Sequence, residues 1–254
     1  MICKAQHSIG EREEDMTAIN RACEGKLQSS KRSLHRGLRE LVVLGMRRSK
    51  ETNYMYITCL DLEGVLVPEI WIEFAEASGI PELKKTTRDE PDYDKLMQYR
   101  INILNEHGLG LKEIQDTIEK INPLPGAKEF LDKLRANGQV IIISDTFSQF
   151  AMPLMKKLGY PTIFCNELTV AEDGKITGYR MRCDQTKLTT VKALQSCGFE
   201  TIASGDSYND LGMIENSAAG FLFRSTDEIK KSHPDVPAFE EYDDLYNAIM
   251  EAQK

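Results

Sequence analysis

Two carboxylates, Asp61 and Glu63, stand directly after the apolar segment 55–60 and just before Gly64. The segment is typical of a buried strand, so both acidic side chains follow a strand that enters the core. Placing a carboxylate near a core costs free energy unless a partner or a cation binds it. A short strand ending in an acidic turn is the ordinary alternative. Residues further along the chain favour a cation site at Asp61 and Glu63.

Polar residues also follow two later apolar segments. Ser144 and Asp145 come after residues 140–143, the motif 205–210 (Gly-Asp-Ser-Tyr-Asn-Asp) comes after residues 201–204, and Lys187 opens a helical pattern between them. Carboxylates at neighbouring strand ends can converge on one Mg²⁺, which takes oxygen ligands. A hydroxyl and backbone N–H groups can hold phosphate oxygens, and a lysine adds positive charge there. These parts suit phosphoryl transfer, in which positioning and charge neutralisation supply most of the catalysis.

The elements that must position these residues alternate between strands and helices. The expected strands are residues 55–60, 140–143, 162–165, 201–204 and 220–223, and helical patterns cover 128–137, 186–196 and 208–216. This alternation predicts an α/β fold with a doubly wound, Rossmann-like parallel sheet. Ligands of such sheets bind at the carboxyl ends of the strands, where the polar residues stand. Residues 168–181, with a turn at 172–175, predict a β-hairpin.

One region interrupts the alternation. Residues 69–121 show helical patterns over 70–77, 93–106 and 111–119 and no convincing strand. We expect residues 69–121 to form a helical cap over the carboxyl end of the sheet, and residues 55–68 and 122–254 to form the core. The apolar side chains expected in the interior include Trp71, Phe74, Met97, Met152 and Met155.

Residues 1–54 differ from the rest of the chain. They contain 11 Lys or Arg and 7 Asp or Glu, which gives a net charge of +4. Because the whole chain has a net charge of −8, residues 55–254 carry −12. Three interpretations stay open: a disordered basic extension, an amphipathic targeting segment, or sequence upstream of a translation start at Met55. Acidic residues such as Glu13 and Glu14 count against a transit peptide, which is usually poor in acid.

The composition excludes several classes of protein. The 254 residues are 41% hydrophobic and 28% charged, which is typical of one large globular domain or a domain with an insertion. The net charge of −8 argues against nucleic-acid binding. No apolar run approaches the roughly 18–20 residues that cross a bilayer. The six cysteines form no C-x-x-C pair, which argues against a zinc site or a redox motif. We therefore expect a reduced, cytoplasmic protein.

The motifs together resemble the haloacid-dehalogenase superfamily of aspartate-nucleophile phosphatases. The matching parts are residues 61–65 (Asp-Leu-Glu-Gly-Val), Ser144, Lys187 and the motif 205–210, which is typical of the phosphoserine phosphatase branch. Residues 61–69, 86–89 (Thr-Thr-Arg-Asp) and 144–147 (Ser-Asp-Thr-Phe) are similar to bacterial phosphoserine phosphatases that also act as homoserine phosphotransferases. The similarity runs from Met55 to Tyr246 and leaves residues 1–54 without a counterpart.

This resemblance implies a role for each matching residue. Asp61 would be the nucleophile that forms an aspartyl-phosphate, and Glu63 would be the general acid and base. Asp61, the Glu63 carbonyl and Asp206 would bind Mg²⁺, with Asp210 orienting them. Ser144, the Asp145 backbone and Lys187 would bind the phosphoryl group, and Asn209 would contact the phosphate or the acceptor. Arg100 would bind the substrate carboxylate with its planar guanidinium, and Glu69 would meet the substrate ammonium.

The second acid departs from the wider superfamily, in which it is usually Asp. Glu63 has one more methylene, which moves its carboxyl oxygens by about 1 Å, and Val65 stands where Thr is common. The branch named above shares both differences. We expect them to affect the efficiency of hydrolysis by water more than the formation of the phospho-enzyme.

The leading hypothesis is therefore a Mg²⁺-dependent phosphatase of L-phosphoserine that also transfers the phosphoryl group to homoserine. The alternatives are a phosphatase of a sugar or nucleotide phosphate and a regulatory protein of the same fold without catalysis. For single residues, Lys187 could be a solvated helix residue, Arg100 a surface ion-pair partner and Glu69 an acid at a helix N-terminus. The natural acceptor, the existence of residues 1–54 in the native protein and the oligomeric state, including a homodimer, are left open.

Overall fold

A computed structural model describes residues 54–86, 89–90 and 92–254 of the chain. Tyr54 to Lys254 form one compact unit. Residues 1–53 lie outside the described residues, so the three interpretations of residues 1–54 stay predictions. No helix in the described part of the chain is both long enough and apolar enough to span a membrane.

A mostly parallel sheet forms the centre of this unit, as the alternating pattern predicted. Its strand order is β4-β3-β2-β1-β5-β6-β7, which places β1 between β2 and β5. The strands are β1 (Met55–Leu60), β2 (Gln139–Phe147), β3 (Ile163–Val170), β4 (Ile176–Arg180), β5 (Phe199–Gly205), β6 (Ala219–Phe223) and β7 (Ala238–Phe239). Only β3 and β4 pair antiparallel. The carboxyl ends of β1, β2 and β5 therefore lie side by side.

Strand β2 is longer than the sequence predicted. It runs to Phe147, so Ser144 and Asp145 lie within the end of the strand and not after it. The pairing of β2 with β3 is irregular between Ile143 and Phe147. Polar side chains can be accommodated in this stretch because the regular ladder, with its alternation of buried side chains, is interrupted there.

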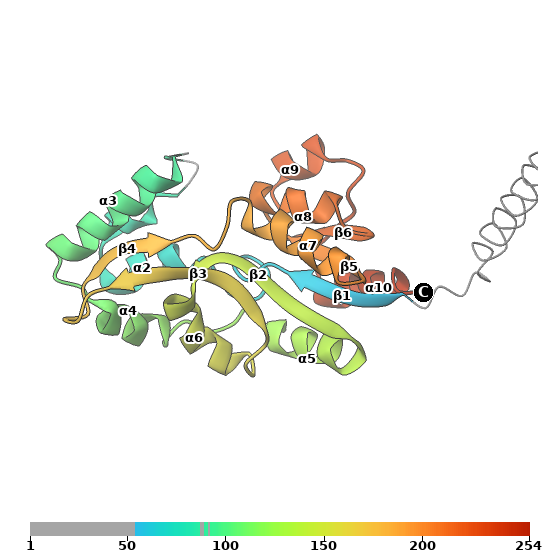
Figure 1. The fold of residues 1–254 in the computed structure, drawn as a ribbon, viewed down its shortest axis with the longest axis horizontal. Helices are drawn as coiled ribbons and strands as arrows, with labels where there is room; N and C mark the ends of the chain where they lie inside the picture. The colour runs from blue at the N-terminus through green and yellow to red at the C-terminus, as the bar shows by residue number, and fades with distance from the viewer. Residues whose placement is uncertain (1–53, 87–88, 91) are drawn as a thin grey trace, which may run out of the picture. The chain divides into compact units, whose positions relative to one another are not determined.

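Helices cover both faces of the sheet, which makes it doubly wound (Figure 1). Neighbouring strand residues belong to different apolar clusters: Cys59 packs with Val191 and Met213, whereas Leu60 packs with Phe130 and Phe150. One face carries α5 (Ala127–Asn137), α6 (Ser148–Lys157) and α10 (Tyr242–Glu251), and the other carries α7 (Thr186–Ser196), α8 (Leu211–Glu215) and α9 (Asp227–Ser232). A short 3₁₀ helix, η2 (Tyr208–Asp210), precedes α8.

The interior contains most of the side chains expected there. Trp71, Phe74, Met97 and Met155 are buried. The expectation for Met152 is wrong, because its side chain is 49% exposed. Helix α6 directs Ala151, Leu154 and Met155 inward, and Met152 lies on the opposite side of this helix.

Residues 69–121 are helical, as predicted, and no strand occurs among the described residues of this range. The elements are α2 (Ile70–Ser78), η1 (Pro81–Lys84), α3 (Tyr93–Glu106) and α4 (Leu111–Ile118). Helix α3 begins after Asp92, whose carboxylate accepts a hydrogen bond from the Lys95 amide at 3.1 Å. This N-cap satisfies one of the amides that a helix start leaves unpaired.

The predicted hairpin forms from β3 and β4, but it also joins the helical insert (Figure 1). The Leu111 amide donates to the Gly174 carbonyl at 2.8 Å. The rings of Tyr93 and Tyr179 meet edge to face at 5.8 Å, and the Tyr179 hydroxyl donates to Asp94. The hairpin thus packs against α3 and α4, although it follows them by more than 40 residues. The division into a core of residues 55–68 and 122–254 and a cap of residues 69–121 stays a prediction.

Candidate active site

A cavity of about 940 Å³ brings the predicted site residues together. Its lining combines residues from the ends of β1, β2 and β5 with residues of the helical insert. The predicted site residues that line it are Asp61, Glu63, Glu69, Arg100, Ser144, Asp145, Lys187, Asp206 and Asn209. Asp210 is fully buried and lies behind this surface.

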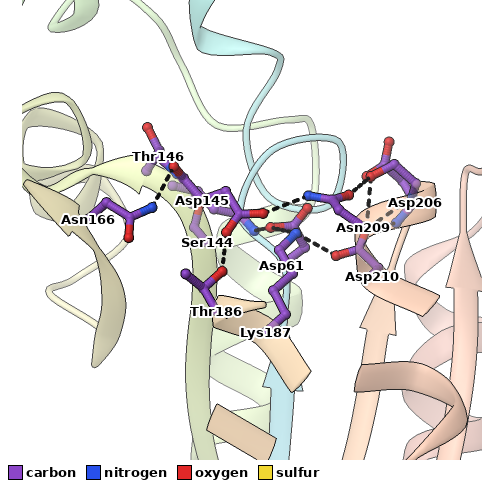
Figure 2. Close-up of polar contacts among 12 residues, drawn as sticks. Asp61, Ser144, Asp145, Thr146, Asn166, Thr186, Lys187, Asp206, Asn209 and Asp210 are labelled. Carbon is purple, nitrogen blue, oxygen red and sulfur yellow. Dashed lines mark hydrogen bonds and ion pairs between the residues drawn. The ribbon is translucent and has the colours of Figure 1, made fainter. Parts of the chain in front are cut away.

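Lys187 lies between two buried carboxylates (Figure 2). Its Nζ is 2.9 Å from Oδ1 of Asp61 and 2.5 Å from Oδ1 of Asp210, and its side chain is only 3% exposed. Burial lowers the pKa of Lys187, but the charges of Asp210 and Asp61 more than offset it and keep the pKa above its ordinary value. Lys187 is therefore a fixed, charged ammonium and not a solvated helix residue.

The predicted nucleophile has one oxygen without a protein partner. Oδ1 of Asp61 accepts hydrogen bonds from the Leu62 amide at 2.8 Å and from Lys187. Among the described residues, no donor contacts its Oδ2. One oxygen thus fixes the orientation of the carboxylate, and the other is left for a ligand.

Asp210 organises the loop after β5. Its Oδ2 accepts hydrogen bonds from the amides of Asp206 and Ser207, each at 3.0 Å. A Cβ on Gly205 would lie 2.2 Å from Cγ of Asp210, so only glycine fits beside this carboxylate. The Asp206 carbonyl in turn accepts from the Ser225 hydroxyl at 2.5 Å. These contacts hold Asp206 at the wall of the cavity.

Gly64 brings the loop after β1 against Asp206. Its φ of +76° is in the left-handed region, and a Cβ there would lie 2.5 Å from Cγ of Asp206. Both facts require glycine at this position. The close approach places the Asp206 carboxylate beside the loop that contains Asp61 and Glu63.

Three carboxylates form a cluster suited to a cation. Oxygens of Asp61, Asp206 and Asp210 lie within 4.8 Å of one another. Burial and the charge of Asp210 raise the pKa of Asp61 well above its ordinary value and that of Asp206 to about 7. Without a cation the ionised carboxylates repel one another, and Lys187 supplies one positive charge among them. The donor set is all oxygen, which fits a hard divalent cation.

Glu63 lies in a setting that favours its protonated form. Burial and the nearby Glu69 carboxylate raise the pKa of Glu63 to about 8, although its Oε2 accepts a hydrogen bond from the Ile70 amide at 2.9 Å. This amide is the first of α2, so the helix start fixes the orientation of the carboxyl group. A protonated carboxyl group with a fixed orientation can serve as a general acid.

Arg100 contributes to the cavity a guanidinium that has no carboxylate partner among the described residues. It stacks on the Trp71 ring at 4.4 Å, and Nη2 donates to the Lys85 carbonyl at 2.8 Å. Its side chain is buried, and Nε has no hydrogen-bond partner. No carboxylate among the described residues forms an ion pair with Arg100, so the surface ion pair considered for it is excluded there. A buried guanidinium without a carboxylate partner suits the binding of an anion.

Asn209 contacts a protein carboxylate in this structure (Figure 2). Its Nδ2 donates to Oδ2 of Asp145 at 2.9 Å. The contact of Asn209 with the phosphate or the acceptor, which the family resemblance implies, stays a prediction. Ser144 is buried at the cavity wall, and its Oγ accepts from the Thr146 amide at 3.2 Å. The hydroxyl proton of Ser144 therefore stays available for a ligand.

Among the lining residues that were not assigned to the site from the sequence, three contact or accompany predicted site residues. Trp71 was expected only in the core, but it also lines the cavity, and its ring stacks against the Arg100 guanidinium. Tyr93 reaches the cavity from the start of α3, two helical turns before Arg100. The hydroxyl of Thr186 donates to Asp145. The seven-residue spacing of Tyr93 and Arg100 could have placed both on one helix face; the contact of Thr186 had no sequence signal.

Comparisons with known sequences agree with this geometry. The family model for haloacid dehalogenase-like hydrolases matches residues 61–215. The chain is 49% identical over 198 residues to phosphoserine phosphatase ThrH of Pseudomonas aeruginosa, which covers 78% of this chain and 97% of that protein. It is 48% identical to a phosphoserine phosphatase of Pseudomonas syringae pv. tomato, with 77% and 83% covered.

Solved structures show the same fold. A phosphoserine phosphatase from T. onnurineus superposes with a TM-score of 0.59 at 24% identity and covers 80% of this chain and 98% of its own. A substrate-bound phosphoserine phosphatase complex superposes with a TM-score of 0.62 at 22% identity and covers 74% and 94%. At these identities the superpositions establish the fold alone.

Proposed function

The chain belongs to the haloacid dehalogenase-like hydrolases, and we propose that it is a Mg²⁺-dependent phosphoserine phosphatase that works through an aspartyl-phosphate on Asp61. We further propose that the same phospho-enzyme passes its phosphoryl group to homoserine. The names of the two Pseudomonas relatives support the substrate.

One observation carries the proposal: the cavity joins two kinds of chemistry. At the strand ends it presents Asp61 with Lys187, which suits a phosphoryl group. On the side of the helical insert it presents the guanidinium of Arg100, which has no carboxylate partner among the described residues, and the carboxylate of Glu69. A phosphomonoester with an α-carboxylate and an α-ammonium matches both regions. A sugar phosphate has no carboxylate and would leave the buried guanidinium without an anionic partner, which costs free energy.

The first step uses Asp61 and Glu63. A carboxylate oxygen of Asp61 attacks phosphorus, the bond between phosphorus and the serine oxygen breaks, and Glu63 donates its proton to that oxygen. The raised pKa of Glu63, about 8, keeps this proton available at neutral pH. The products are serine and the aspartyl-phosphate, with Glu63 left as a carboxylate.

The second step reverses the role of Glu63. Its carboxylate takes a proton from water or from the hydroxyl of homoserine, and the resulting oxygen nucleophile attacks phosphorus. The bond between phosphorus and the Asp61 oxygen breaks and restores the free carboxylate. Arg100 and Glu69 can bind homoserine through the same carboxylate and ammonium groups that serine carries, which supports transfer to this acceptor.

The acidic cluster would hold the cofactor. Asp61, the Glu63 carbonyl and Asp206 are the proposed ligands, and Asp210 holds the loop that carries Asp206. When bound there, Mg²⁺ would offset the negative charge of the carboxylates and of the phosphoryl oxygens. Beside this cluster, the protein's own positive charge comes from the Lys187 ammonium, which contacts Asp61 and Asp210.

A substrate panel tests the proposal. Phosphoserine, phosphoethanolamine, a hexose phosphate and a nucleoside monophosphate are compared by released phosphate, with Mg²⁺ and with a chelator. We expect phosphoserine to have the highest kcat/KM, and phosphoethanolamine to lose most of it because it lacks the carboxylate. A preference for the sugar or nucleotide ester would replace the proposed substrate. Absence of turnover on every ester would favour a non-catalytic member of the family.

We also propose a reduced, cytoplasmic setting. The described cysteines, Cys59, Cys165, Cys183 and Cys197, are all free thiols, which supports it. Fractionation of the source cells tests the location, and recovery with a membrane or secreted fraction would oppose it. Light scattering on the purified chain would distinguish a monomer from the homodimer that the sequence left open.

A further inference from the structure

Both oxygens of the Asp145 carboxylate are bound by side chains from other elements (Figure 2). Oδ1 accepts a hydrogen bond from the Thr186 hydroxyl at the start of α7, and Oδ2 accepts from Asn209 Nδ2 at 2.9 Å. The Asp145 carbonyl accepts from Asn166 Nδ2 at 3.0 Å. The Asp145 side chain thus connects the end of β2 with α7 and with η2.

These two contacts lie next to the residues that perform the chemistry. Thr186 immediately precedes Lys187, and both side chains are buried. Asn209 immediately precedes Asp210, which binds Lys187 and the Asp206 amide. Any displacement of Thr186 or Asn209 would therefore be passed to the ammonium or to the acidic cluster.

The charge of Asp145 needs an explanation at this position. The cavity already contains Asp61 and Asp206 near the phosphoryl site, and a further carboxylate opposes the binding of an anion. A neutral side chain would bind phosphate better unless the carboxylate has another use. Its acceptor oxygens offer one, because a carboxylate accepts from two donors at once whereas an amide has one acceptor oxygen.

We propose that the Asp145 carboxylate is a positioning residue that aligns Lys187, through Thr186, and the metal-binding loop, through Asn209, for phosphoryl transfer. This inference rests on the proposed phosphatase function and goes beyond the backbone contact predicted for Asp145. Because misplacing a reacting group by about 1 Å can cost about 100-fold in rate, the alignment should act on kcat. Binding of the ground-state anion should not weaken, since the variants below keep Lys187 and D145N removes a charge that opposes the anion.

Matched substitutions test the proposal. D145N removes one acceptor and the charge, T186V removes the hydroxyl with little change in shape, and T186S keeps the hydroxyl. T189V, on the exposed side of the same helix, is the control. We measure kcat and KM on phosphoserine and on p-nitrophenyl phosphate, the affinity for inorganic phosphate by calorimetry, and the melting temperature.

We expect D145N and T186V to lower kcat about 10–100-fold. The Kd for inorganic phosphate should stay within about threefold of the wild type in T186V and should be equal or lower in D145N, which loses a charge that opposes the anion. T186S and T189V should keep wild-type kcat. The proposal is overturned if D145N and T186V keep wild-type kcat, if T186S is as impaired as T186V, or if Kd rises in step with the loss of kcat. Should T186V fail to fold, D145N and T186S carry the comparison. Wild-type turnover of p-nitrophenyl phosphate but not phosphoserine would refute the proposed substrate and leave this test intact.

Discussion

Asp61 and Lys187 set the chemistry at the scale of single residues. Lys187 binds one oxygen of Asp61 at 2.9 Å and leaves the other without a protein donor. We predict that D61N loses at least about 1,000-fold in kcat, because an amide oxygen cannot form the acyl-phosphate. The check is steady-state release of phosphate, with D184N at the exposed cavity rim as the control. Activity of D61N near the wild-type level would refute the proposed nucleophile.

The proton on Glu63 matters only when the leaving oxygen needs it. We predict that E63Q lowers kcat/KM for phosphoserine by about 100–10,000-fold but has a much smaller effect on p-nitrophenyl phosphate, whose leaving group departs as a stable anion. The ratio of the two losses is the measurement. Equal losses on both substrates would mean that Glu63 acts in some other way than as a general acid.

Arg100 is the proposed partner of the substrate carboxylate. R100A removes a buried guanidinium that lines the cavity and has no carboxylate partner among the described residues, so we predict that KM for phosphoserine rises about 10–100-fold. Phosphoethanolamine, which differs only in lacking the carboxylate, should show a rise of less than about threefold. A similar increase for both esters would remove Arg100 from the substrate site.

At the scale of elements, the turn after β1 controls the approach of two loops. Gly64 has a left-handed φ and no room for a Cβ beside Asp206. We predict that G64A displaces the Asp206 carboxylate and lowers the apparent affinity for Mg²⁺ by about tenfold or more. G79A is a control, because Gly79 has a similar φ of +70° at the end of α2 but nothing within 4 Å of its added Cβ. Equal Mg²⁺ affinity in G64A and G79A would contradict the role of this close approach.

Several elements could be predicted from their local sequence. Helices α3 and α7 begin and end where the periodicity placed them. Met55–Leu60 is a strand because a mostly apolar run suits a strand whose end is buried on both faces. The extension of β2 past Ile143 was missed because polar residues such as Ser144 and Asp145 break the apolar run. The apolar pattern cannot show that the pairing of β2 with β3 is irregular after Ile143, where Ser144 and Asp145 line the cavity.

The candidate site could be predicted where a motif fixes both residue type and strand end, as for Asp61 and Asp206. Contacts between distant segments could not. Asp145 and Asn209 are 64 residues apart, and neither residue type indicates the other. The same reason explains why the packing of the hairpin against α3, through Tyr179 and Asp94, was not foreseen.

At the scale of the whole molecule, the acidic cluster couples stability to the cation. At pH 8 the Asp206 carboxylate is ionised but disfavoured by burial and by Asp210, so it destabilises the metal-free fold. We predict that metal-free D206N melts about 2–5 °C above the metal-free wild type, an effect of about 1 kcal/mol. Mg²⁺ should raise the melting temperature of the wild type and not of D206N. A lower melting temperature for metal-free D206N would oppose this account.

The most direct test of the central claim is one ³¹P NMR time course. The enzyme is incubated with phosphoserine and Mg²⁺, with and without homoserine, and the signals of phosphoserine, inorganic phosphate and phosphohomoserine are followed together. The account predicts that phosphoserine is consumed, that phosphate appears, and that homoserine diverts part of the phosphoryl group into phosphohomoserine; a chelator should stop every change. An unchanged phosphoserine signal with Mg²⁺ present, under conditions in which the folded enzyme hydrolyses another phosphoester, would contradict it.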